Sequence, residues 1–231
     1  MNSTIAIARA RTVLEELLRP AALRQAREDA VRVWSSVRPK LTLSGETTPS
    51  NRMARFARNI VQAGLPSPAR YLEIGAFEGH SLAFVHALLK GRIAATVIDP
   101  FENYDELPST DMPSIGQRFL ANMQAIGAEV RVLRGTSIEQ LPELIRAREI
   151  FDLIYIDGSH AAMDVLADAA LCWRLLAKNG LMIFDDYRFR AYQNGRTFEC
   201  KSAIDAFAAL IRKDAQIIDV AAQVFIRRTA P

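Results

Sequence analysis

The stretch Tyr71–Ser81, which reads Tyr-Leu-Glu-Ile-Gly-Ala-Phe-Glu-Gly-His-Ser, decides the fold of this chain. A short apolar run ends at Gly75, the chain turns through Gly79, and an apolar helical pattern begins at Leu82. Glycine has no Cβ, so the backbone N–H groups of such a turn can come close to a ligand at the start of a helix. The order strand, glycine turn, helix therefore predicts a site of the size of a nucleotide.

Downstream of this turn, short apolar runs alternate with helical patterns. The first five runs are 70–74, 94–98, 130–134, 152–156 and 181–184. This alternation predicts a mostly parallel, doubly wound, Rossmann-like sheet with helices on both faces. A helix near 199–212 precedes two runs, 216–220 and 223–227, which are too close for a crossover helix and predict an antiparallel C-terminal hairpin. The expected fold is α/β, with a sheet of seven strands.

Local signals predict where several helices begin and end. Ser114 with Gln117, and Ser137 with Gln140, have the spacing of capping boxes. Three glycines stand where helices should end, namely Gly91, Gly127 and Gly180.

Residues 1–64 are predicted to be an N-terminal helical extension, followed by a domain at 65–231. Helical patterns cover 4–18 and 21–36, a third helix ends near Gly64, and 37–49 has the composition of a linker. The extension holds eleven Arg or Lys against five acids. Such a surplus could meet an acidic partner or a membrane surface, but a solvated face on docked helices is the simpler interpretation. Amphipathic helices of this kind often find a partner, which favours a homodimer.

The bulk composition bounds the function classes. The chain has 231 residues, of which half are apolar and 24% charged, as expected of a globular protein. No uncharged apolar stretch reaches about 18 residues, so we expect neither a membrane span nor a secretion signal. Cys172 and Cys200 lack metal-site spacing, and we expect reduced thiols in a cytoplasmic protein. The net charge of +3 and the lack of a base-reading motif argue against nucleic acid.

The glycine turn predicts a nucleoside ligand without phosphates. Its spacing is Gly-x-x-x-Gly, and Phe77 and Glu78 stand where a dinucleotide-binding turn has the glycine that admits a pyrophosphate. The next apolar run ends at Asp99, where an acid can bind both ribose hydroxyls. The third run ends in Gly-Thr-Ser at 135–137, a small turn suited to an adenine edge. An NAD-dependent dehydrogenase is therefore the weaker interpretation.

Three carboxylates are predicted to meet at the carboxyl edge of the sheet. Asp157 ends the run Phe151–Ile156, and Asp185 and Asp186 end the run Leu181–Phe184. If these strands are neighbours, the acids either raise one another's pKa or recruit a cation, because neither motif contains Lys or Arg. An all-oxygen set suits Mg²⁺, or Ca²⁺ or Mn²⁺ in its place, and suits zinc poorly. The alternative is that these acids only cap strand ends and turns.

These motifs resemble those of class I S-adenosylmethionine-dependent methyltransferases, and specifically the small-molecule O-methyltransferases that need a divalent cation. Residues 73–81 resemble the first motif of the catechol O-methyltransferase group. Ile-Asp-Gly-Ser-His at 156–160 and Phe-Asp-Asp-Tyr at 184–187 also resemble bacterial relatives that methylate sugars on antibiotics. The resemblance covers about residues 65–231.

The resemblance implies a role for each motif. In the family, the residue at Ser81 helps to hold the methionyl carboxylate, the acid at Asp99 holds the ribose, and the turn at 135–137 holds the adenine. The expected cofactor contacts are Glu73, Gly75, Phe77, Gly79, Ser81, Asp99, Gly135, Thr136, Ser137 and Asp157. The expected metal ligands are Asp157, Asp185 and Asp186.

His160 is the candidate general base. It lies three residues beyond Asp157, where catechol-type enzymes carry a lysine and some of the sugar-methylating relatives carry a histidine. A neutral imidazole is suited to removing a hydroxyl proton near pH 7. The alternative is a histidine that caps the next helix or faces solvent.

The predicted activity is therefore methyl transfer from S-adenosylmethionine to a hydroxyl of a small molecule, such as a sugar, a catechol or a polyketide. His160 and Asp157 are the predicted catalytic residues, and Mg²⁺ is the predicted cation. The loop 102–113 and the stretch 187–197 are expected to shape the acceptor site. A metal-independent methyltransferase and a non-catalytic nucleoside-binding protein of the same fold are the alternatives.

Overall fold

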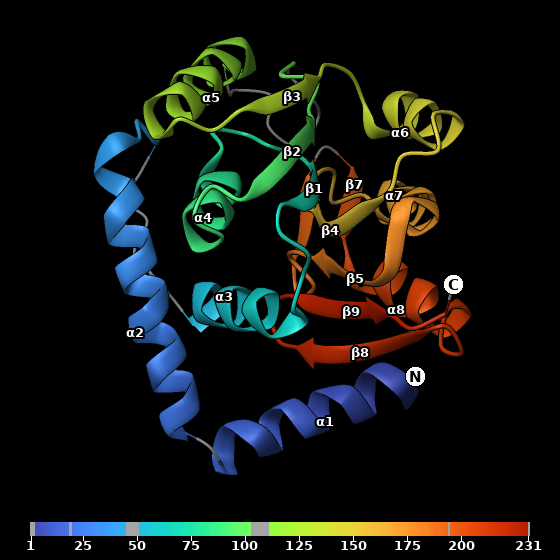
Figure 1. The fold of residues 1–231 in the computed structure, drawn as a ribbon. Coiled ribbons are helices and arrows are strands. Elements are labelled where there is room, and N and C mark those ends of the chain that lie inside the picture. The colour runs from blue at the N-terminus through green and yellow to red at the C-terminus, as the bar shows by residue number, and fades with distance from the viewer. Residues whose placement is uncertain (1–2, 19, 45–50, 103–110, 194, 231) are drawn as a thin grey trace.

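A seven-stranded sheet with the order β3-β2-β1-β4-β5-β9-β8 forms the centre of the molecule (Figure 1). The computed structural model describes residues 3–18, 20–44, 51–102, 111–193 and 195–230. Five strands are parallel, namely β1 (Ala69–Ile74), β2 (Ile93–Ile98), β3 (Val130–Leu133), β4 (Phe151–Ile156) and β5 (Leu176–Phe184). β9 (Val224–Arg228) runs antiparallel to both β5 and β8 (Ala215–Val220). The predicted α/β fold with its antiparallel C-terminal hairpin is confirmed.

Helices cover both faces of this sheet, which is why its central strands are apolar on both sides. All six residues of β4 are buried. One face carries α2 (Pro20–Val37), α3 (Asn51–Ala63), α4 (His80–Leu88) and α5 (Met112–Ile126). The other carries α6 (Ser137–Arg146), α7 (Ala162–Leu175) and α8 (Lys201–Leu210).

Of the three N-terminal helices, α1 (Ser3–Leu18) and α3 pack on the sheet, whereas α2 packs on α3 and α4. Trp34 of α2 and Phe56 and Ile60 of α3 belong to the same hydrophobic core as Tyr155 of β4. α1 lies along β8, the last strand of the sheet (Figure 1). The predicted domain boundary at residue 64 stays a prediction. The helices before it share hydrophobic core clusters with the sheet.

The outer surface of α1 is apolar in several places. Exposed side chains there include Ile7, Leu14, Leu17 and Leu18. The homodimer stays a prediction. Within the described part of the chain, no helix combines the length and hydrophobicity that a membrane crossing requires.

Helix ends differ from prediction in three places. α5 begins after Asp111, whose carboxylate accepts the N–H of Ser114, and α6 begins with a capping box between Thr136 and Glu139. Both predicted capping pairs were therefore wrong: Asp111, three residues before Ser114, caps α5, and Thr136, one residue before Ser137, caps α6. Gly180 lies inside β5 rather than at the end of α7. A Cβ at this glycine would stand 2.9 Å from the carbonyl oxygen of Ala177, so close backbone approach explains it.

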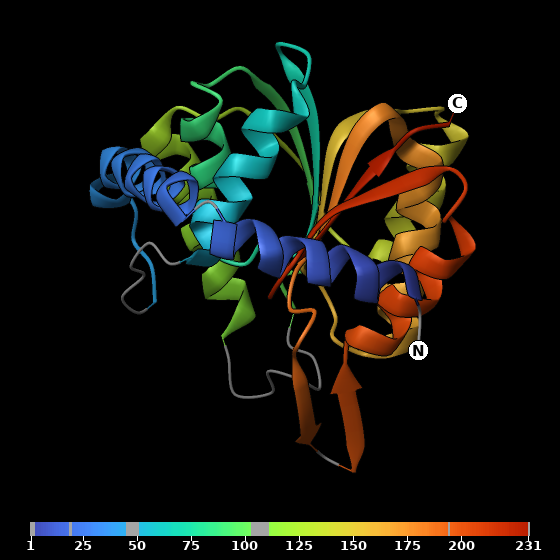
Figure 2. The same ribbon diagram turned by 90° about the horizontal axis from the view of Figure 1, so that it is seen from below.

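A second, two-stranded sheet, which sequence patterns did not indicate, overlaps the stretch 187–197 and extends beyond it to Glu199. β6 (Arg190–Gln193) and β7 (Arg196–Glu199) pair antiparallel and project away from the main sheet (Figure 2). Two other predicted segments are described only in part. A short 3₁₀ turn, η1 (Arg38–Lys40), opens the predicted linker 37–49. Residues 45–49 of this linker and residues 103–110 of the loop 102–113 lie outside the described part of the chain.

Candidate functional site

A cavity of about 500 Å³ opens at the carboxyl edge of the sheet, next to the glycine turn. This volume lies in the range of ordinary small-molecule sites, roughly 300–1,000 Å³. The predicted cofactor residues that line it are Gly75, Phe77, Asp99, Thr136, Ser137 and Asp157. The remaining four predicted residues do not line it: Glu73 lies in β1, Ser81 lies in the first turn of α4, and Gly79 and Gly135 lie in the turns before α4 and α6. Their contact with a cofactor stays a prediction.

The two glycines of the turn are required by packing as much as by ligand approach. A Cβ at Gly75 would stand 2.2 Å from the carbonyl oxygen of Asp157, so the turn after β1 passes directly against the end of β4. At Gly79 a Cβ would stand 2.4 Å from Cε of Met123 in α5. Both glycines also have φ above +80°, a conformation that other residues rarely adopt.

Asp99 holds the turn in shape as well as lining the cavity. Its Oδ2 accepts the backbone N–H groups of Ala76 (2.8 Å) and Phe77 (3.0 Å), and its Oδ1 accepts that of Phe101 (2.7 Å). Each carboxylate oxygen has two lone pairs, so Oδ2 is fully used and one acceptor position remains on Oδ1 for a ligand hydroxyl. The sequence placed Asp99 at the cavity but did not predict that it fastens β2 to the glycine turn.

Glu73 is fully buried behind the turn. Its carboxyl group accepts hydrogen bonds from the hydroxyls of Tyr71 (2.9 Å) and Ser81. Burial raises its pKa to about 8, against the lowering effect of these two hydrogen bonds. The role of Ser81 at a methionyl carboxylate stays a prediction.

The raised pKa of Glu73 predicts a specific pH dependence of stability. The folded chain keeps this proton up to about pH 8, whereas the unfolded chain loses it near the ordinary value of 4.5. Stability should therefore fall as the pH rises between these two values, by up to about 1.4 kcal/mol per pH unit. Glu73→Gln keeps the shape and one acceptor oxygen, and its NH₂ can donate to the second hydroxyl, but it cannot titrate. In denaturant titrations from pH 5 to pH 9, it should show a flatter dependence and exceed the wild type above pH 8. Parallel curves for the two proteins would contradict the assignment.

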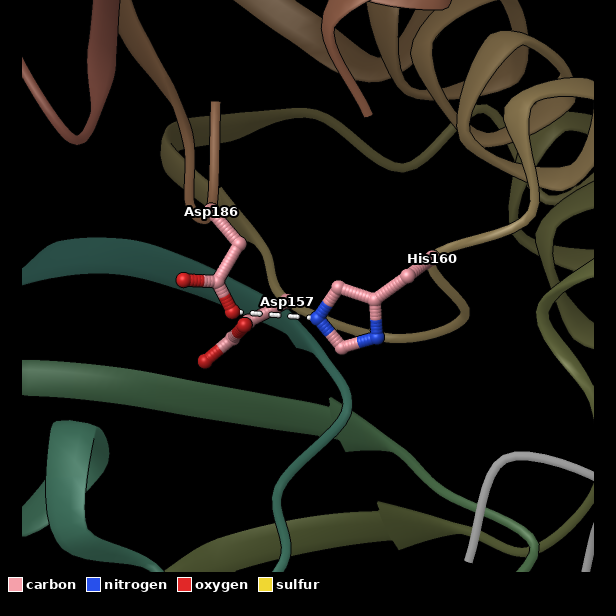
Figure 3. A group of neighbouring side chains, drawn as sticks. All are labelled: Asp157, His160 and Asp186. Atoms are coloured by element: carbon pink, nitrogen blue, oxygen red, sulfur yellow. Dashed lines mark hydrogen bonds and ion pairs between the residues drawn. The ribbon is translucent and has the colours of Figure 1, made fainter. Parts of the chain in front are cut away.

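Asp157, His160 and Asp186 come together at the carboxyl ends of β4 and β5 (Figure 3). One ligand atom from each lies within 4.8 Å of the others. Asp186 adopts φ +49°, so the chain turns sharply at the end of β5. Burial, followed by the charges of Asp185 and Asp186, raises the pKa of Asp157 well above its usual range. Two of the three acids predicted to meet at this edge, Asp157 and Asp186, therefore lie in one group with His160, and metal binding there stays a prediction.

His160 contacts Asp186 through its ring. The Nε2 atom lies 3.0 Å from Oδ2 of Asp186 (Figure 3), and the ring of Phe189 packs 4.3 Å away, centroid to centroid. The hydrogen bond to His160 lowers the pKa of Asp186. With the proton on Nε2, His160 donates to Asp186 and Nδ1 becomes the basic nitrogen. Sequence reasoning found both residues but not this contact.

Asp185 faces a different set of partners. Its carboxylate accepts from the hydroxyl of Tyr155 and from Nε2 of Gln223 (3.3 Å), and it pairs with Arg52. Arg52 also reaches Asp186, with 3.2 Å between Nη1 and Oδ1. Neither acid motif contains Lys or Arg, but Arg52 of α3, which is distant in the sequence, brings a positive charge to both acids.

Asp168 is a cavity residue that sequence reasoning missed. It lies on α7, is 2% exposed, and is hydrogen-bonded to the side chain of Ser137. Burial raises its pKa to about 7. The one available signal was an acid on the apolar stripe of α7, beside the buried Val165 and Cys172.

The methyltransferase domain family matches residues 72–187, which span the glycine turn, Asp99 and the acid cluster. The chain belongs to this family. The predicted class of protein is thereby confirmed. This chain is also 30% identical over 120 residues to the O-methyltransferase hkm8 of Aspergillus hancockii. That alignment covers 52% of this chain and 43% of hkm8, so the chain spans less than half the length of this relative.

Two solved structures have a fold similar to that of this chain. An O-methyltransferase from Bacillus cereus in complex with SAH has 16% sequence identity and a TM-score of 0.55, over 97% of this chain and all of that one. The MycE methyltransferase of the mycinamycin biosynthetic pathway, in complex with Mg, SAH and mycinamycin VI, has 18% identity and a TM-score of 0.57. The alignment with MycE covers 87% of this chain and 55% of MycE.

Proposed function

We propose that this protein transfers a methyl group from S-adenosylmethionine to a hydroxyl of a small molecule and that it uses a divalent cation to do so. One observation carries the proposal. Asp157 lines the cavity beside the glycine turn and also belongs to the cluster with His160 and Asp186. A cofactor in that cavity would therefore reach the residues suited to activating a hydroxyl.

The cavity residues fit the parts of S-adenosylmethionine. We assign the ribose to Asp99 and the adenine to the turn at 135–137, where Thr136, Ser137 and the buried Asp168 line the wall. When bound, the cofactor supplies a methyl group activated by a sulfonium. Phe77, which is 38% exposed in the turn, covers one side of the space. The proteins hkm8 and the Bacillus cereus enzyme, both described as O-methyltransferases, support the choice of oxygen as the acceptor atom.

The acid cluster fits a divalent cation. Asp157 and Asp186 each offer carboxylate oxygens within 4.8 Å of one another, and crowding opposes ionisation of Asp157 unless a cation is near. We propose Asp157 and Asp186 as the principal ligands, with Asp185 as the third. A bound cation would lower the pKa of an acceptor hydroxyl. Oxygen ligands favour Mg²⁺, with Ca²⁺ or Mn²⁺ able to take its place. The Mg in the MycE complex supports testing Mg²⁺ first.

We assign proton removal to His160. Asp186 holds the ring through Nε2, and Phe189 packs against it, so Nδ1 can take the proton of an acceptor hydroxyl. His160→Gln should lower the rate of methyl transfer by about 10²–10⁴-fold, the usual contribution of a general base. The affinity for S-adenosylmethionine, measured by calorimetry, should stay within about threefold, since His160 does not line the cofactor cavity. An unchanged rate would remove His160 from the mechanism.

A metal-independent methyltransferase is the second candidate, and one observation favours it. Arg52 already brings a positive charge to Asp185 and Asp186. A screen of sugars, catechols and hydroxylated polyketides with S-adenosylmethionine, with Mg²⁺ or with EDTA, separates the two candidates. Activity that requires Mg²⁺ supports the first, and activity that survives EDTA supports the second. Absence of S-adenosylmethionine binding by calorimetry would refute both.

A further inference from the structure

Arg52 reaches the acid cluster from the N-terminal helices. It lies in the first turn of α3, and its two Nη atoms divide between neighbouring carboxylates, Nη2 on Asp185 and Nη1 on Asp186. The side chain is 40% exposed, whereas that of Asp185 is 2% exposed. A partly exposed cation thus pairs with a buried acid.

Asp186 is the carboxylate over which Arg52 and a metal ion would compete. Its Oδ1 faces Arg52 at 3.2 Å, and its Oδ2 faces His160 at 3.0 Å. A divalent cation on Asp157 and Asp186 would stand within a few ångströms of the guanidinium, where like charges repel strongly at a partly buried site. The metal and Arg52 therefore cannot both keep their best contacts with this carboxylate.

The rest of α3 is anchored elsewhere. Arg55 and Asn59 bind Asp219 on β8, and Asn59 also bonds back to the carbonyl of Arg55. Arg52 can therefore change its rotamer without detaching the helix from the sheet. A local side-chain movement is enough to vacate Asp186.

We propose that Arg52 is an exchangeable internal cation: its guanidinium holds Asp185 and Asp186 until a divalent cation binds at Asp157 and Asp186 and displaces it towards solvent. The inference rests on the proposed cation site and goes beyond it. Arg52 would set the concentration of metal at which the site fills, and metal binding would change the surface that α3 presents beside the acid cluster.

Direct Mn²⁺ binding tests the competition. Mn²⁺ titrations followed by electron paramagnetic resonance should give at least tenfold tighter binding to Arg52→Gln than to the wild type. Arg52→Lys keeps the charge without the two-pronged fork and should lie between them. Arg32→Gln removes the same charge from an exposed position on α2, where Arg32 is 72% exposed, and should match the wild type.

Displacement itself is tested by labelling arginines with phenylglyoxal and mapping the sites by mass spectrometry. Labelling of Arg52 should rise at least threefold on saturation with Mn²⁺. Arg55, which is 6% exposed, should stay protected, and Arg32 should be labelled equally in both states. This readout separates displacement from a general effect of charge.

Equal Mn²⁺ affinity in the wild type and Arg52→Gln, or labelling of Arg52 that does not rise with Mn²⁺, would overturn this inference and leave the cation site standing. Absence of Mn²⁺ binding to every variant would overturn the cation site, and this inference with it.

Discussion

Replacement of Asp157 by alanine is expected to lower the rate of methyl transfer by two or more orders of magnitude. Asp157 both lines the cofactor cavity and belongs to the cluster with His160 and Asp186. Its removal takes one carboxylate ligand from the proposed cation site. The site then no longer holds the cation that would lower the pKa of the acceptor hydroxyl. The measurement is the single-turnover rate with saturating S-adenosylmethionine and Mg²⁺, together with Mn²⁺ affinity, which should fall in parallel.

The fold should tolerate this change. Asp157 is an acid whose pKa is raised by burial and by neighbouring carboxylates, so its removal relieves repulsion at neutral pH. The hydroxyl of Tyr155, which lies 3.2 Å from Asp157, keeps its bond to Asp185. Asp214→Ala is a suitable control. This exposed acid precedes β8 and so lies at the amino ends of the parallel strands, whereas Asp157 lies at their carboxyl ends. Full activity and unchanged Mn²⁺ binding in Asp157→Ala would refute the metal role.

Replacement of Asp219 by alanine is expected to have the largest effect on stability, a loss of about 3–5 kcal/mol in the free energy of unfolding. Asp219 is 1% exposed on β8 and accepts from Arg55, Arg58, Asn59 and Thr12. Burial opposes its charged form, but these hydrogen bonds and charges hold its pKa below the usual range. Without it, the buried Arg55 loses its ion pair with a buried carboxylate.

Chemical denaturation near neutral pH measures this loss. Asp29→Ala is the matched control, since it removes an exposed partner of Arg32 on α2 and should change stability by less than about 1 kcal/mol. Because its pKa is lowered in the folded state, Asp219 takes up a proton at low pH and the wild type loses stability there. The stability of Asp219→Ala should therefore depend less on pH in the acid range. A loss below 1 kcal/mol would show that α1 and α3 are held mainly by their apolar contacts.

Much of the site was predictable because its residues stand at strand ends. Asp99, Asp157 and Asp186 each follow an apolar run, and parallel strands bring their carboxyl ends to one edge. The alternation of runs and helices was enough to predict that these strands share a sheet. Local sequence therefore placed the acids near one another without any knowledge of their contacts.

The contacts themselves were not predictable in this way. Arg52 and Asp185, or Arg55 and Asp219, meet across more than half the chain, and no periodicity links them. The basic surplus of residues 1–64 was interpreted as a solvated face, but Arg52, Arg55 and Arg58 turn inward to compensate buried acids. Asp168 was missed because a buried acid on a helix has no sequence pattern of its own until its partner Ser137 is placed.

For the glycine turn Tyr71–Ser81, the sequence by itself determined a tight strand-to-helix connection, because only glycine adopts the required φ at Gly75 and Gly79 without strain. The tertiary structure decided which groups occupy the space that a Cβ at each glycine would need. The backbone at Asp157, just after β4, leaves no room for a Cβ at Gly75, and at Gly79 a Cβ would have to displace the end of the Met123 side chain. Local conformation is encoded by neighbouring residues, whereas packing depends on segments that only the folded sheet brings together.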